Sequence, residues 1–289
     1  MSKARRIGAL RIAALRLHPL KGGRGLEVEA ARVEVLGLCG DRRWLATDAD
    51  GRFLTQRDCP GLARVDADYP DANDVSRLRL AAEGAGEIVA TGDGPQAEVN
   101  IWRDVAVARA AGADADAWLA SVLGRPARLW FMADETARTT EEGFCAPGPV
   151  SFADAYPVLV VNTGSLAALN DALDAPVAMA RFRPNIVVEG AAPWAEDAWR
   201  TLTTGDGVEL ELVKPCRRCE VTTLDPATGE NLGEEPLRAL SRVRKSGDPA
   251  VKGFLFGWNA IVRAGGLLRV GDAVEVAAAK TPWPIAGDA

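Results

Sequence analysis

The segment from residue 214 to residue 230 reads Lys214-Pro215-Cys216-Arg217-Arg218-Cys219-Glu220-Val221-Thr222-Thr223-Leu224-Asp225-Pro226-Ala227-Thr228-Gly229-Glu230. It places two thiols three residues apart among three cations. Cations close to a cysteine favour its thiolate form, which is both the nucleophile and the metal ligand. A β-branched run follows Cys219, and the Asp225-Pro226 pair is typical of a turn. The pattern therefore predicts that the two cysteines lie at the start of a strand.

A bare pair of cysteines at this spacing has three simpler interpretations. A structural zinc site needs four ligands, but the other cysteines are isolated and His18 is the single histidine. A thioredoxin-like dithiol has its first cysteine at a helix N-terminus, whereas the residues after Cys219 are strand-like. Two ordinary packing cysteines with solvated arginines are the default. The residues around the cysteine pair and elsewhere in the chain are needed to choose among these three interpretations.

Length and charge limit the class of protein. The chain has 289 residues, enough for two domains or one large β-rich unit. It carries 34 Lys and Arg against 40 Asp and Glu, a net charge of −6. This balance argues against general nucleic-acid binding, which relies on a basic surface. No apolar run approaches the length of a transmembrane helix, so we expect no membrane partner.

Cysteine and histidine usage excludes several chemistries. Five cysteines, an odd number, make a disulfide framework improbable, and the single histidine argues against a two-histidine zinc motif or a Ser-His-Asp triad. The basic N-terminus runs into an apolar stretch that Arg11 and Arg16 interrupt, which does not match a signal peptide. We therefore expect a cytoplasmic protein with reduced thiols.

Short β-like runs dominate the first half of the sequence. They cover residues 7–17, 26–35, 43–47, 77–81 and 99–108. Residues 48–51 end in Asp-Gly and predict a hairpin turn, because this dipeptide tolerates positive φ. Apolar residues at helical spacing predict one helix that starts at the capping residue Asp114 and ends before Gly124.

The second half continues in the same style from about residue 125. Strand patterns cover residues 128–132, 158–161, 181–188 and 208–213, and residues 267–277 predict a closing strand pair around a turn at 270–272. Residues 163–173 and 237–243 predict two short helices. No glycine-rich phosphate fingerprint follows a strand, which disfavours a Rossmann fold. We predict a mostly β fold with a few helices, arranged as two β-barrel-like units.

These motifs resemble those of the MOSC family, named for the C-terminal domain of molybdenum-cofactor sulfurase, in the branch of YcbX-like proteins and the mitochondrial amidoxime-reducing components. Residues 214–230 resemble the family signature. Residues 18–25 (HPLKGGRG), 40–45 (GDRRWL) and 53–57 (FLTQR) are similar to its N-terminal β-barrel domain. Residues 182–188 (FRPNIVV), 255–257 (LFG) and 268–272 (LRVGD) are similar to the MOSC domain. The motifs occur in the family order over nearly the whole chain.

The resemblance implies an N-terminal β-barrel domain at residues 1–122, a MOSC domain at residues 123–289, and a molybdenum cofactor in the cleft between them. It implies that Cys219 ligates the metal, since thiolates suit thiophilic metals. It also carries pyridoxal phosphate binding as a family-level association. The residues that match cofactor-contact positions, or stand at them with a different side chain, are Lys21, Arg42, Arg183, Asn185, Arg217, Arg218 and Asn259.

Several of these positions depart from the family pattern. Arg217 stands where relatives carry serine or proline, and Asn259 replaces a tyrosine. Gly22 replaces a serine beside Lys21, and residues 155 and 156 are alanine and tyrosine where the mitochondrial branch has hydroxyl residues. We therefore expect a basic cofactor site whose polar detail differs from that of relatives.

The activity implied by the resemblance is the reduction of N-oxygenated, N-hydroxylated substrates, with the oxygen removed as water. Cys219 and Asp225 are the candidate catalytic residues; the role of Asp225 is either to cap its turn, which is the favoured interpretation, or to relay protons near the substrate. No cysteine cluster follows residue 219 for an iron–sulfur centre. We therefore expect a separate electron donor of the ferredoxin, flavodoxin or cytochrome-reductase type.

Two other functions remain open. The protein is alternatively a carrier of sulfur or molybdenum cofactor that holds a persulfide on Cys219, or a pair of barrels that no longer binds cofactor. Metal and pterin content distinguishes the three. Structural roles are expected for His18 and Cys216, and packing roles for the other three cysteines.

Overall fold

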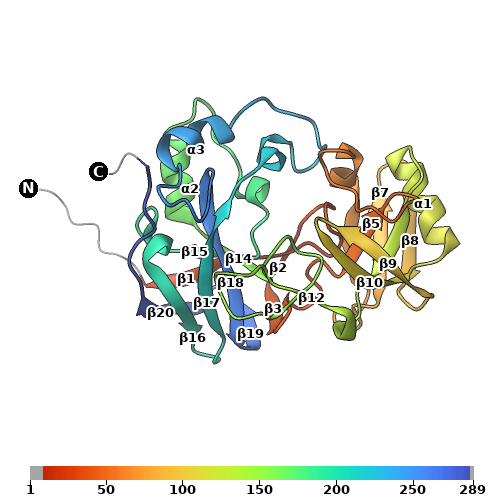
Figure 1. Cartoon of the computed structure of the whole chain (residues 1–289), viewed down its shortest axis with the longest axis horizontal. Coiled ribbons are helices and arrows are strands. Elements are labelled where there is room, and N and C mark those ends of the chain that lie inside the picture. Colours follow the sequence, from red (N-terminus) through yellow and green to blue (C-terminus); the bar gives the residue numbers. More distant parts are fainter. Residues whose placement is uncertain (1–8, 287–289) are drawn as a thin grey trace, which may run out of the picture.

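The computed structural model describes residues 9–286 and is mostly β, with two groups of sheets side by side (Figure 1). Within these residues there are three α-helices, which are α1 (Ala113–Leu123), α2 (Thr163–Asn170) and α3 (Leu237–Val243). No helix in this range is long and apolar enough to span a membrane. The predicted fold class is confirmed.

The larger group contains a closed seven-stranded barrel. Its strands are β1 (Leu10–Leu17), β14 (Val158–Asn162), β15 (Ile186–Glu189), β16 (Trp199–Thr204), β17 (Glu209–Arg217), β18 (Leu255–Ala264) and β20 (Ala273–Ala279). They follow the order β15-β14-β18-β17-β16-β20-β1, and β1 pairs back to β15. The short strand β2 (Leu26–Val28) adds to β1. Closure leaves no open edge along these strands.

Apolar side chains fill the barrel and cover part of its outer face. The interior includes Leu15, Val160 and Trp258, each at most 1% exposed. A small sheet of β19 (Gly266–Arg269), β3 (Ala30–Glu34) and β4 (Gly37–Leu38) packs against the same core. Helices α2 and α3 cover the outer face, where the rings of Phe182 and Phe256 stack at 3.9 Å.

The second group combines two sheets with helix α1. One sheet has the order β5 (Trp44–Thr47), β11 (Arg128–Phe131), β10 (Asp104–Ala110) and β9 (Gln96–Ile101), and the other contains β6 (Asp66–Asp68), β7 (Arg77–Ala82) and β8 (Gly86–Thr91). A common core of Trp44, Leu62, Leu78, Leu119 and Leu129 joins them. The remaining pair, β12 (Arg138–Thr139) and β13 (Pro149–Val150), leads from this group to the barrel.

The predicted domain boundary between residues 122 and 123 stays a prediction. The pairing of strands does not follow this boundary. Strand β1 is the seventh strand of the barrel, since it pairs with β15 on one side and with β20 on the other. Conversely, β11 follows residue 123 and pairs with β5 and β10 of the second group. Each group therefore contains a strand from the other side of the boundary.

Local predictions succeed where glycine or periodicity marks an element. The hairpin at residues 48–51 is present, with Gly51 at φ 77° and the Asp48 carboxylate accepting from the amide of Arg52 at 2.9 Å. Helix α1 ends at Gly124 in the left-handed conformation, although its N-cap is Gly112 rather than Asp114. Helix α3 has the predicted bounds. Helix α2 ends at residue 170 instead of 173, and the chain continues as turns.

Three strand predictions are wrong in detail. Residues 99–108 form the hairpin of β9 and β10, in which Trp102 turns the chain at φ 55°. Residues 179–182 form a 3₁₀ helix followed by Arg183 at φ 51°, so only the second half of the run 181–188 is extended. Strands β19 and β20 flank the predicted turn but pair with β3 and with β16 instead of each other.

Candidate functional site

Four cations from distant parts of the sequence meet between the two groups of sheets. We call Lys21, Arg42, Arg183 and Arg218 the basic cluster. Arg42 Nη2 donates to the backbone carbonyl of Arg183 at 3.2 Å, and Arg218 Nη2 donates to the carbonyl of Phe182 at 2.6 Å. Arg183 in turn donates to the carbonyl of Gly23, two residues after Lys21, at 2.8 Å. The fold thus brings together the four cations that the sequence motifs singled out.

Asn185 holds one member of the basic cluster in place. It is 1% exposed, and its Oδ1 accepts from the amide of Leu159 at 3.0 Å and from Arg42 Nη1 at 3.3 Å. The same Arg42 atom donates to the Asp41 carboxylate, whose other oxygen accepts from the amide of His18. The side chain of Asn185 is therefore committed to orienting Arg42.

The backbone is strained at two members of the basic cluster. Arg42 and Arg183 both have φ 51°, a left-handed conformation that side chains other than glycine rarely adopt. Such residues cost about 1–3 kcal/mol each and are retained where the surrounding structure fixes them, often at functional sites. Here the fixing contacts are the hydrogen bonds within the cluster itself.

The basic cluster carries more positive than negative charge, because within the described residues its four cations face only the carboxylates of Asp41 and Asp154. Burial, followed by the charge of Arg42, lowers the pKa of Arg183 to about 9. Burial also lowers the pKa of Lys21, although the nearby Asp154 acts in the opposite direction. The pKa of the buried His18 is well below its usual value, because of desolvation and then the charge of Arg183. A bound anion would relieve this repulsion.

Two donor atoms of the basic cluster are buried without a partner. They are Nη2 of Arg183 and Nε of Arg218, and Nδ1 of the adjacent His18 is unpartnered as well. An unsatisfied buried donor costs about 1–3 kcal/mol, and more when it is charged. The cluster therefore suits an anion with several acceptor oxygens.

The two cysteines lie at the end of a strand, so the prediction of a strand after them is wrong. Strand β17 ends at Arg217, and Cys219 caps a 3₁₀ helix over Glu220–Thr223. The carbonyl of Cys219 accepts from the hydroxyl of Thr222 at 2.9 Å. Short polar side chains can bond the backbone in this way and favour a turn over a strand, whatever their β-propensity.

The two thiols have different surroundings. Cys219 is exposed, whereas Cys216 is half-buried against the outer core of the barrel and accepts from Arg218 Nη1 at 2.9 Å. Arg217 is exposed and lies against Gly253. Lys214 pairs with Glu141, with Nζ 2.5 Å from Oε2. Cys219 is therefore the cysteine that is accessible to a ligand.

Asp225 and Asn259 have structural partners. The Asp225 carboxylate accepts from the amides of Ala227 and Thr228 at 2.7 and 3.0 Å, and these bonds hold its pKa below the usual range. It thus caps its own turn, and its catalytic role stays a prediction. Asn259 is half-buried on β18, in register with Leu159 and Lys214. Within residues 9–286, no hydrogen bond joins its side chain to the basic cluster.

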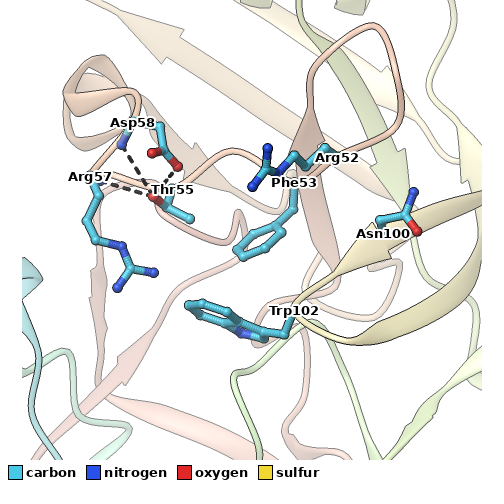
Figure 2. Close-up of a pocket in the computed structure, with 7 residues that line it drawn as sticks. All are labelled: Arg52, Phe53, Thr55, Arg57, Asp58, Asn100 and Trp102. Atoms are coloured by element: carbon cyan, nitrogen blue, oxygen red, sulfur yellow. Dashed lines mark hydrogen bonds between the residues drawn. The ribbon is translucent and has the colours of Figure 1, made fainter.

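Figure 2 shows a cavity of about 610 Å³. It adjoins the basic cluster, because Lys21 Nζ lies 5.8 Å from the ring centre of its lining residue Phe53. We call this cavity the aromatic pocket. The residues that line it are Arg52, Phe53, Thr55, Arg57, Asp58, Asn100 and Trp102. The carboxylate of Asp154 accepts from Lys21 Nζ at 2.5 Å and from Trp102 Nε1 at 3.2 Å. Arg57 Nε lies 3.7 Å from Glu220 Oε1, next to Cys219. The aromatic pocket therefore borders both the basic cluster and the cysteine turn.

Sequence analysis missed Trp102 and Asp154. Desolvation raises the pKa of the Asp154 carboxyl, but the charges of Lys21 and Arg42 outweigh it and hold the pKa below its usual range. The available signal was the Trp-Arg-Asp tripeptide between two alternating β runs, which marks a hairpin tip. Asp154 has no comparable local signal, because its role depends on a lysine 133 residues away.

Comparison with known families agrees with the geometry. The MOSC N-terminal beta barrel domain matches residues 9–126, and the MOSC domain matches residues 147–275. The chain belongs to the MOSC family. The basic cluster thus combines Lys21 and Arg42 from the first match with Arg183 and Arg218 from the second.

Relatives of this MOSC chain include the mitochondrial amidoxime-reducing components. Component 1 of Mus musculus is 31% identical over 277 residues, covering 91% of this chain and 81% of the relative. Component 2 of Bos taurus is 33% identical over 281 residues, covering 91% and 82%. Component 1 of Homo sapiens is 31% identical over 281 residues, with the same coverage.

Solved structures resemble the MOSC chain more distantly. The YUAD protein of Bacillus subtilis is 8% identical, with a TM-score of 0.44 over 92% of this chain and 94% of that one. YiiM of Geobacillus stearothermophilus is 12% identical, with a TM-score of 0.30 over 44% of this chain and 55% of that one.

Proposed function

We propose that the protein binds a molybdenum cofactor between its two groups of sheets and reduces N-hydroxylated compounds with electrons from a separate donor protein. The observation that carries the proposal is the basic cluster, with its unpartnered buried donors, next to the exposed Cys219. Several relatives are named amidoxime-reducing components, which supports the same substrate class.

The residues present fit such a cofactor. Its phosphate is an anion with several acceptor oxygens, which matches the unpartnered Nη2 of Arg183 and Nε of Arg218. Cys219 offers a soft thiolate ligand at the same site. When bound, the cofactor supplies a metal that takes up electrons and changes oxidation state as the substrate loses its oxygen.

The protein's own residues position these parts. The hydroxyl of Thr222 fixes the carbonyl of Cys219, so the thiol projects from an ordered turn. Asp41 and Asn185 hold Arg42 from two sides. The Asp154 carboxylate, whose pKa lies below the usual range, remains ionised at neutral pH. It therefore acts as a hydrogen-bond acceptor for Lys21 rather than as an acid.

Metal analysis combined with a turnover assay tests the proposal. The purified protein should contain about one molybdenum and one pterin per chain and should reduce benzamidoxime with dithionite-reduced viologen. NADH alone should give no turnover. A Cys39→Ala variant, altered in a half-buried cysteine bonded to Arg32, is the matched control and should behave like the wild type.

Other results would contradict specific parts of the proposal. Turnover with NADH and no added protein would show a built-in electron path. Labile sulfur without molybdenum would favour the persulfide carrier. Protein expressed in cofactor-producing cells that holds neither would be a MOSC chain without cofactor.

A further inference from the structure

Resting on the proposed function, we propose that the aromatic pocket binds the body of the substrate and selects planar aromatic acids. Its cavity of about 610 Å³ lies within the range of small-molecule sites, which is about 300–1,000 Å³. The substrate class is an aromatic ring that bears an N-hydroxylated group, such as an amidoxime, at one end and a carboxylate at the other.

Trp102 provides a preorganised aromatic wall. Its side chain is 48% exposed, an unusual position for the largest apolar residue, and its backbone is held at φ 55°. Phe53 packs edge-on against it (Figure 2), with ring centroids 4.9 Å apart. The Asp154 carboxylate accepts from its indole N–H at 3.2 Å. A strained residue with this many restraints keeps its ring in place without a ligand. The exposed part of the indole that Arg57 does not cover is available to stack a planar ring.

Guanidinium groups supply the selectivity for an acid. Arg57 lies over the indole of Trp102 at 5.1 Å, and Arg52 lines the opposite side of the cavity (Figure 2). The carboxylate of Asp58 already accepts from the hydroxyl of Thr55 at 2.8 Å. Because Arg57 already lies 3.7 Å from the Glu220 carboxylate, Arg52 is the lining guanidinium that we assign to a substrate acid, and guanidinium binds carboxylates in a planar, bidentate manner.

The aromatic pocket also lies next to the turn that carries Cys219, as a substrate site should under the proposed function. Arg57 lies between Trp102 and Glu220, and Glu220 follows Cys219 directly in the chain. The Thr55 hydroxyl accepts from the amide of Arg57 at 3.1 Å, which orders the backbone of this arginine. A ring stacked on Trp102 would thus lie close to Arg57, the lining residue that reaches toward the cysteine turn.

Paired kinetics and binding measurements test the inference. Turnover with reduced viologen is compared for 4-carboxybenzamidoxime and benzamidoxime, and binding of the non-reducible 4-carbamoylbenzoate is measured by calorimetry. KM for the acid should be about tenfold lower than for benzamidoxime, as expected for one charge-assisted contact. Arg52→Gln should remove this preference. Trp102→Ala should raise KM for both substrates about five- to tenfold, as expected for a lost aromatic contact, with kcat within twofold.

Controls separate the pocket from the fold and from the proposed function. Trp102→Phe keeps a ring and should restore most of the affinity, and Val105→Ala, an exposed change on the same hairpin, should leave both substrates unaffected. If no variant turns over but Trp102→Ala loses 4-carbamoylbenzoate binding, the reductase proposal fails and the pocket stands. If Trp102→Ala turns over with unchanged KM and binds 4-carbamoylbenzoate as the wild type does, the aromatic pocket does not bind the substrate. Loss of molybdenum from Trp102→Ala would assign the cavity to the cofactor, and this result would also overturn the inference that the aromatic pocket binds the substrate.

Discussion

Arg183 Nη1 donates a hydrogen bond to the backbone carbonyl of Gly23 at 2.8 Å, across 160 residues of chain. The bond ties the loop before β15 to the turn after β1, and Arg42 completes the link by donating to the carbonyl of Arg183. Nη2 of Arg183 remains unpartnered. One guanidinium thus joins two segments of the fold and offers a free donor to an anion.

Replacing Arg183 with alanine should weaken cofactor retention. A charge-assisted hydrogen bond contributes about 1.5–3 kcal/mol, so the affinity should fall about 10- to 150-fold. Molybdenum content after extended dialysis measures the loss. The control is Arg263→Ala, which removes an exposed arginine paired with Glu211 on the barrel. Full molybdenum retention by Arg183→Ala would show that this arginine does not hold the cofactor.

The two cysteines should respond differently to substitution. Cys219→Ala should lose one sulfur ligand from molybdenum and with it the activity, because Cys219 is the exposed thiol of the pair. Cys216→Ala should keep most of the activity and lose packing and its contact with Arg218. X-ray absorption at the molybdenum edge counts the sulfur neighbours in each variant. A sulfur missing only from Cys216→Ala would reverse the assignment.

A buried ion pair inside the fold should contribute strongly to stability. Arg244 Nη2 lies 2.7 Å from the Asp197 carboxylate, which also accepts from Trp258 Nε1 at 2.9 Å, and both charged side chains are at most 8% exposed. Removing one partner of such a pair costs about 3–5 kcal/mol, because the other charge stays buried. Arg244→Leu should therefore lower the free energy of unfolding in urea by this amount.

Two variants check the interpretation of this ion pair. Arg263→Leu breaks an exposed pair with Glu211 and should cost less than about 1 kcal/mol. The double variant Arg244→Leu, Asp197→Leu should be more stable than the sum of the two single changes predicts. Strict additivity would mean that the two side chains stabilise the fold independently.

Lys280 should make stability depend on pH. Its Nζ lies 3.3 Å from the ring centre of Trp258, and burial lowers its pKa to about 7, against the opposing effects of Asp197 and Glu211. An unfolded lysine has a pKa of about 10.4, so between these values the unfolded chain binds a proton that the folded chain has released. Stability then rises with pH across this window.

A Lys280→Met variant isolates the effect, since methionine does not titrate. The free energy of unfolding of the wild type, minus that of the variant, should be constant below about pH 7 and increase from there toward pH 10. Urea titrations at one-unit pH intervals measure this difference. Parallel curves over the whole range would mean that Lys280 keeps its ordinary pKa in the folded protein.

Sequence reasoning succeeded where a local pattern carries the information. Glycine at positions 51 and 124 marked a turn and a helix end, and the periodicity of residues 237–243 marked α3. The basic cluster was found through motifs, because each arginine alone looks like an ordinary surface residue. Their convergence comes from the barrel topology, which places Arg183 within hydrogen-bond distance of the carbonyl of Gly23.

The failures have two physical causes, which are tertiary contacts at Trp102 and local side chain–backbone hydrogen bonds after Cys219. Trp102 turns the chain at a positive φ that its residue type disfavours, held by Phe53 and Asp154. The β-branched residues after Cys219 form a 3₁₀ turn, because the hydroxyls of Thr222 and Thr223 bond the backbone. Trp102 and Asp154 are 52 residues apart in the sequence, whereas Thr222 and Thr223 bond carbonyls only three residues back.

The position of β1 in the barrel also constrains how the protein folds. Arg11 pairs with Glu189, and Leu10 pairs with Val274, so the ring cannot close until the ribosome has made residue 274. Contacts of such large sequence separation slow folding, and the partly made chain exposes unpaired strands while it waits. Until residues 186–189 and 273–274 have been made, β1 therefore has only the short neighbouring strand β2 to pair with, and most of its length stays open to other chains.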